Sequence, residues 1–173
     1  MKHIIRNIAL VLLLTVLAAP AASAQLRKGE KSLGPRIAFV SENTSVLAGL
    51  SFQYSFSRHV RISPEVACVF RHHDRDAFLL DLNVHLPFGI GSDKVVLYPL
   101  AGVGYSSWAQ HISGAEYDQQ KDVTTHDNRF GANLGAGFEL RCTRTLKLSL
   151  EARYLLIKTY SHAQVGLGIA YIF

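Results

Sequence analysis

The chain has 173 residues, of which 49% are hydrophobic and 18% charged, and its formal net charge is +5. This length corresponds to one domain. The basic excess is modest and falls largely at positions that we expect to face a closed interior, so it does not indicate a nucleic-acid-binding surface.

The first 24 residues have the three parts of a secretory signal peptide. Two cations precede an apolar run, and small residues of an Ala-x-Ala cleavage site follow it. The apolar run is shorter than the roughly 20 residues that a helix needs to cross a bilayer. We therefore expect residues 1–24 to be removed by cleavage between Ala24 and Gln25, which leaves residues 25–173 as a single domain and lowers the net charge by two.

Beyond the signal peptide, apolar and polar residues alternate along eight segments. A period of two predicts β-strands, because successive side chains of a strand point to opposite faces. In the second segment, for example, Val46 and Leu50 lie on one face and Ser45 and Ser51 on the other, and only Leu47 breaks the polar face. The eight expected strands are residues 32–41, 45–56, 60–71, 78–88, 95–108, 130–141, 146–154 and 162–173. The facing of residues 99–106 stays open.

Short and long connections alternate between these strands. We expect short turns at residues 57–59, 89–94 and 142–144, and longer connections at residues 42–44, 72–76, 107–127 and 155–160. Short turns at one rim and longer loops at the other are typical of outer-membrane barrels, whose loops are outside and whose turns are periplasmic. An even number of strands then places both termini in the periplasm.

Aromatic residues gather near both ends of the expected strands. Two aromatic bands around an apolar wall indicate a lipid-facing surface, because amphipathic rings settle at the membrane interfaces. A soluble β-sandwich also alternates, but it gives no reason for this banding. The expected periplasmic band is Phe52, Tyr54, Phe56, Phe88, Tyr98, Phe138, Tyr171 and Phe173, and the outer band is Phe39, Phe70, Phe78, Trp108, Phe130, Tyr154 and Tyr160.

The opposite face of the strands carries charged residues of both signs. Eight strands enclose an interior only wide enough to be filled by side chains. We therefore expect these charges to pair in a polar network inside the barrel rather than to line a wide channel. The expected members are Arg36, Arg61, Glu65, Arg71, Asp81, His85, Glu139, Arg141, Lys147, Glu151 and Arg153.

Residues 30–173 resemble the small outer-membrane barrels of the OmpA/OmpX and opacity-protein type. The most specific part is the end of the chain, which resembles the signal read by the outer-membrane assembly machinery: Gln164, Gly166, Ile169, Tyr171 and Phe173. The resemblance implies an all-β, eight-stranded antiparallel transmembrane barrel that this machinery inserts among outer-membrane lipids. It does not indicate an activity, because such barrels include adhesins, structural proteins and lipid-modifying enzymes.

One motif suggests an enzyme. His111 and Ser113 have the His-x-Ser spacing of outer-membrane lipid A deacylases, but in that family the pair lies on the barrel wall, whereas here it falls in the expected long loop. A solvated loop is the favoured interpretation. The histidines at this rim also lack the compact spacing of a metal site. We therefore expect no catalytic residue, metal or cofactor.

Of an interaction or structural barrel, a lipid-modifying enzyme and a narrow pore, the sequence favours the first. The interior is too small and too charged for general diffusion. Loops on a rigid scaffold are where partners bind, and the longest loop, with Trp108, His111 and Tyr117, is the candidate contact surface. The sequence does not identify the partner. We expect a monomer.

Overall fold

The computed structural model describes residues 27–41, 44–72, 75–90, 92–112, 123–157 and 161–173, and these form antiparallel strands. No helix in these ranges is long and apolar enough to cross a membrane. The strands are β1 (Lys31–Val40), β2 (Ser45–Ser55), β3 (Arg61–His72), β4 (Arg75–His85), β5 (Phe88–Ile90), β6 (Ser92–Ile112), β7 (Val123–Arg141), β8 (Leu146–Ile157) and β9 (His162–Ile172).

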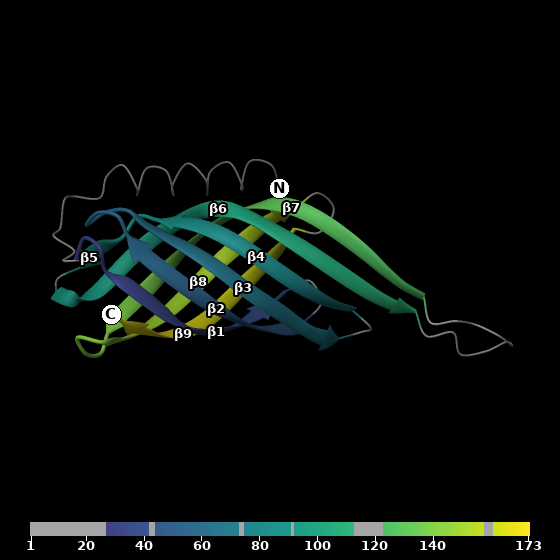
Figure 1. Ribbon diagram of the computed structural model, residues 1–173, viewed down its shortest axis with the longest axis horizontal. Helices are drawn as coiled ribbons and strands as arrows, with labels where there is room; N and C mark the ends of the chain where they lie inside the picture. The colour runs from purple at the N-terminus through teal and green to yellow at the C-terminus, as the bar shows by residue number, and fades with distance from the viewer. Residues whose placement is uncertain (1–26, 42–43, 73–74, 91, 113–122, 158–160) are drawn as a thin grey trace, which may run out of the picture.

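The sheet closes on itself to form a barrel (Figure 1). β1 pairs with both β2 and β9, and β4 pairs with β6, so every strand of the ring has two neighbours. The short β5 pairs with β6 directly after β4 and continues it past Pro87, which has no N–H to donate. Together they count as one strand, which confirms the expected eight-stranded antiparallel barrel.

The two ends of the barrel differ. One end, called the turn end here, holds the connections 56–60 and 142–145 and the first and last described residues, where the Lys31 amide donates to the Phe173 carbonyl at 3.3 Å. The other end, called the loop end, holds the ends of β6 and β7, which run past the other strands at the right of Figure 1.

The outer wall of the barrel is apolar. In β8 the exposed positions carry leucine, alanine or tyrosine, and buried positions alternate with them along most of the strand. Leu50, Leu150 and Leu167 lie on this wall with about half of each side chain exposed. An apolar surface of this extent on a closed barrel is what hydrocarbon requires, because closure leaves no sheet edge along the wall that faces lipid.

Two of the expected wall aromatics point into the barrel instead. Tyr98 is 1% exposed, and Trp108 packs against buried apolar residues of the interior. The sequence prediction was wrong for both. For Tyr98 the reason is that residues 95–100 are apolar on both faces, with Val96 and Leu100 inside and Leu97 on the outer side. Period two identifies this strand but cannot say which face is inside.

The expected long loop at residues 107–127 is shorter than predicted. β6 continues to Ile112 and β7 begins at Val123, so His111 lies on a strand rather than in a loop, and Trp108, expected where strand and loop overlap, lies within β6. Tyr117 and Ser113 lie outside the described residues. The strand ends are polar and no longer alternate, because a sheet that extends past the bilayer has no lipid-facing side. β8 likewise continues to Ile157, and β6 begins at Ser92.

Candidate functional site: the barrel interior and the β6–β7 hairpin

The interior near the turn end is built around the carboxylate of Glu139. Arg61 Nη1 lies 2.7 Å and Lys147 Nζ 3.2 Å from Glu139 Oε2. The Arg61 guanidinium also lies 3.1 Å from His85 Nδ1 and 4.9 Å from the centre of the Tyr98 ring, which stacks on His85. All of these side chains are buried. Three strands of the wall, β3, β7 and β8, supply the ions, so the group ties distant parts of the chain together.

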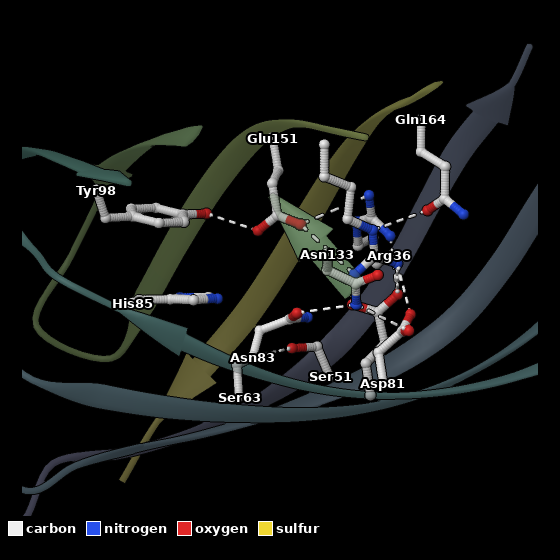
Figure 2. A network of polar contacts seen from close by, with 12 residues as sticks. Arg36, Ser51, Ser63, Asp81, Asn83, His85, Tyr98, Asn133, Glu151 and Gln164 are labelled. Atoms are coloured by element: carbon white, nitrogen blue, oxygen red, sulfur yellow. Dashed lines mark hydrogen bonds and ion pairs between the residues drawn. The ribbon is translucent and has the colours of Figure 1, made fainter. Parts of the chain in front are cut away.

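A second group fills the middle of the barrel around Glu65. Its Oε1 accepts hydrogen bonds from Arg36 at 2.8 Å and from Arg153 at 2.7 Å, and Arg153 lies 3.1 Å from Asp81. Figure 2 shows how Asn133 continues this group: its amide nitrogen donates to both Asp81 and Asn83 at 3.0 Å. The carboxylates thus have cations or amides as partners, as a buried charge requires.

Tyr98 joins the two groups. Its hydroxyl donates to Glu151 at 3.1 Å, and the other oxygen of Glu151 lies 3.6 Å from the Arg36 guanidinium (Figure 2). Opposite Tyr98 in the register is Gly137, where a Cβ would overlap the Tyr98 ring. The glycine therefore provides the space that lets an aromatic side chain lie inside a narrow barrel.

The structure brings most of the residues expected in the lumen into these two groups. Arg141 is partly exposed at the turn end, where it pairs with Glu30 and also lies 3.7 Å from Glu139 Oε1 at the rim of the first group. The side chain of Arg71 lies outside the description. Sequence reasoning missed five members of the network that carry no charge. The polar face of its strand contains each of them except Tyr98. The five are Gln53, Asn83, Tyr98, Asn133 and Gln164.

Toward the loop end the interior becomes apolar. A cluster of buried residues closes this part of the lumen, and the Trp108 indole packs against it with its ring edge-on to His162, 6.2 Å between ring centres. Leu47, which interrupts the polar pattern of β2, belongs to this cluster. The interior is therefore filled by an ionic layer and an apolar layer. The cluster consists of Ala38, Val40, Leu47, Ala67, Val69, Ala77 and Leu79.

The β6–β7 hairpin rises beyond the rest of the loop end. β6 and β7 pair without a break to Ile112 opposite Val123, but β8 pairs with β7 only up to Gly131 opposite Ile157. Among the described residues, 123–130 of β7 therefore have β6 as their one strand partner. At its base, the Phe130 ring is 81% exposed and lies 5.1 Å from the Tyr105 ring.

Nothing in the described part of the chain assembles the chemical sites that the sequence raised. His111 lies on β6 opposite Thr124, while Ser113 falls outside the description, so the geometry of this pair is not defined. No group of three metal-ligating side chains gathers among the described residues.

The residues that resemble an assembly signal occupy both faces of β9. Gln164 points inward and accepts a hydrogen bond from Arg153 Nε at 2.8 Å. Ile169, Tyr171 and Phe173 lie on the outer wall with half or more of each side chain exposed. Recognition of this strand by the assembly machinery stays a prediction.

Comparison with known proteins shows what this barrel is similar to. The N-terminal β-barrel domain of OprF from Pseudomonas aeruginosa has 16% identity and a TM-score of 0.68, over 84% of this chain and 98% of that one. Ail, the attachment invasion locus protein of Yersinia pestis, has 19% identity and a TM-score of 0.61, over 85% and 100%. Neisserial surface protein A has 14% identity and a TM-score of 0.64, over 83% and 96%.

These likenesses concern the fold, since the identities are low. No curated relative matches the sequence. The model of the family described as outer membrane protein beta-barrel domain matches residues 9–173, which is nearly the whole chain. Together with the closed barrel and its apolar wall, this match confirms the expected resemblance: the chain belongs to the outer membrane β-barrel domain family and is a small outer-membrane barrel protein.

Proposed function

We propose that this protein is a surface-interaction barrel that binds an extracellular partner through its loop end and does not act as a general-diffusion pore. The observation that carries the proposal is the β6–β7 hairpin, in which residues 123–130 of β7 have, within the described part of the chain, β6 as their one strand partner. Open edges present unpaired backbone N–H and C=O groups to which an extended segment of another protein can add as a strand. The filled interior supplies a rigid base for the hairpin.

The charge of the hairpin helps to define the partner. In the sequence, residues 107–127 contain four carboxylates and one lysine. One of the structures similar to this barrel is that of Ail in complex with the heparin analogue sucrose octasulfate, a sulfated and therefore anionic ligand. The acidic segment of the present chain disfavours such a ligand. We therefore propose a protein partner, and we further propose that the mature chain begins at Gln25, with both termini periplasmic.

Labelling of intact cells tests which end faces outward. The two native cysteines are free and exposed, so they are first replaced by serine. Asn128→Cys on the hairpin should then react with a membrane-impermeant maleimide on intact Gram-negative cells, because the loop end lies outside. Arg144→Cys at the turn end is the matched control and should react only after the outer membrane is permeabilised. Labelling in the reverse order would contradict the proposed topology.

Shortening the hairpin tests the interaction itself. Replacing residues 109–126 by an Asn-Gly turn joins Trp108 to Asp127, which stand opposite each other in the register. It removes residues 123–126 of this β7 edge and keeps the barrel strands within the wall. Cells that display the shortened protein should lose adhesion to immobilised extracellular proteins that the intact protein binds. Heat-dependent gel mobility serves as the control that both barrels are folded. Equal adhesion by both proteins would contradict a role for the hairpin.

A further inference from the structure

An apolar groove crosses the outer wall obliquely and has a volume of about 520 Å³. One of its sides is a row of residues that face each other across the strand register, from Leu50 through Val66, Leu80 and Tyr105 to Phe130. The other side consists of Leu33, Phe52, Pro64, Leu82 and Val103. Its volume falls within the range of about 300–1,000 Å³ that is typical of ligand sites.

The groove runs from the turn end toward the loop end. It begins at Leu33 near the start of β1 and ends at Phe130 in β7, which spans five strand spacings, or about 24 Å. In its course the pairing of β2 and β3 skips the positions beside Pro64, which has no N–H to donate. Aromatic rings lie near both ends of the groove, Phe52 toward the turn end and Tyr105 with Phe130 toward the loop end.

Exposed cations gather where the groove meets the turn end. Lys31 lies on the same face of β1 as Leu33, two residues or about 7 Å nearer the turn end, and stands opposite Tyr54. The Gly29 amide donates to the Ser55 carbonyl at 2.8 Å, which holds the preceding residues beside the end of β2. Four exposed cations thus lie on this side of the turn end: Arg27, Lys28, Lys31 and Arg58.

Glu30, the carboxylate between Lys28 and Lys31, does not neutralise these cations. The side chain of Glu30 is 7% exposed and pairs with Arg141. The wall therefore combines a groove that accepts hydrocarbon with a positively charged entrance at the height where interfacial aromatic residues mark the headgroup region. An anionic lipid presents both features in the same order, an acyl chain and then a phosphate.

We propose that this groove is a binding site for an anionic phospholipid of the leaflet that surrounds the turn end. The acyl chain lies between the two rows of wall residues, and the phosphate meets Lys31 and the neighbouring cations. Such a lipid covers the stretch of wall where the strand pairing is interrupted at Pro64, and it fixes the height of the barrel in the membrane.

Lipid retention tests this proposal. The mature chain is reconstituted in vesicles of equal parts phosphatidylcholine and phosphatidylglycerol, extracted in mild detergent, and its retained lipids are counted by native mass spectrometry. The protein should retain phosphatidylglycerol over phosphatidylcholine by about tenfold, a preference that a few cations at a membrane surface can supply. Neutralising Arg27, Lys28, Lys31 and Arg58 together to glutamine should abolish the preference but leave the barrel folded.

Matched variants separate the parts of the site. Val103→Trp fills the groove at a side chain that is 62% exposed, and should lower retention of both lipids, whereas Leu148→Trp on β8 should not. The double variant Lys94→Gln and Arg144→Gln removes two other exposed turn-end cations, one at the start of β6 and one in the connection 142–145, and should keep the preference. The proposal would be overturned if the fourfold variant kept the preference or if the double variant lost it equally. It would also be overturned if Val103→Trp retained as much lipid as the unmodified protein, or if inorganic phosphate alone displaced the lipid.

Discussion

Replacing Glu139 by alanine is expected to lower the free energy of unfolding by about 3 to 5 kcal/mol, the largest stability effect that we predict for a single substitution in the interior. Glu139 is fully buried and is the carboxylate that Arg61 and Lys147 share. Its removal leaves two buried cations without that partner, and the desolvation that they undergo on folding is then no longer offset. Urea unfolding in lipid vesicles, followed by tryptophan fluorescence, measures the loss.

Two further variants identify the cause of this loss. Glu139→Gln keeps the shape and an oxygen that can accept from Arg61, so it should be less harmful than Glu139→Ala. Asp127→Ala removes an exposed carboxylate that pairs with Arg129 on the hairpin, and little or no change is expected. If Glu139→Ala unfolds at the same urea concentration as Asp127→Ala, the interior ion pairs do not stabilise the barrel.

The sequence was sufficient to predict the fold because the two faces of a barrel wall lie in different surroundings. Lipid outside favours apolar side chains, and the filled lumen inside accommodates polar ones, so alternate residues of a strand differ in polarity. The pattern of β8, with Leu148 and Leu150 against Lys147 and Glu151, therefore shows which face is outside without knowledge of the neighbouring strands. The signal weakens where both faces meet similar surroundings. Around Tyr98 both faces are apolar, and in the β6–β7 hairpin both are polar, so the facing of one and the length of the other were mispredicted.

The contacts between interior side chains depend on how neighbouring strands are aligned, and the alternation of residues within one strand does not specify this alignment. The alternation placed Glu65, Arg36 and Arg153 on the inner face, but their distances follow from how β1, β3 and β8 are staggered around the ring. The same holds for Leu47, which looked like an exception to the polar face of β2. It belongs to the apolar layer near the loop end, and only the structure shows that the lumen has two layers.

The groove on the wall could not be predicted for a similar reason. Each of its rows collects one residue from each of several strands, and these residues lie far apart in the sequence. Pro64 and Val103 are ordinary apolar residues in their own strands. They line the groove because they lie in one row with Leu82 between them in the register, beside the row that contains the longer Leu80 and Tyr105.

The final prediction concerns the face that meets lipid, and it compares two arginine substitutions one residue apart in β8. Leu150 lies on the outer wall and is 46% exposed, whereas Ser149 points inward opposite Glu139. Leu150→Arg places a charge in hydrocarbon and should cost roughly 2 to 4 kcal/mol near the midplane, less where the bilayer is thin and the charge lies nearer to water. Folding yields in short-chain and long-chain phosphatidylcholine vesicles measure this dependence.

The inward substitution provides the control because its cost has a different origin. Ser149→Arg adds volume and positive charge to a lumen that already holds Lys147 and Arg153, so it should be harmful to a similar degree in thick and thin bilayers. The sensitivity to lipid length therefore distinguishes the two faces even if both variants fold poorly. A penalty for Leu150→Arg that does not change with chain length would mean that this face of β8 is not in contact with the bilayer, and with it the lipid groove on the same wall would lose its basis.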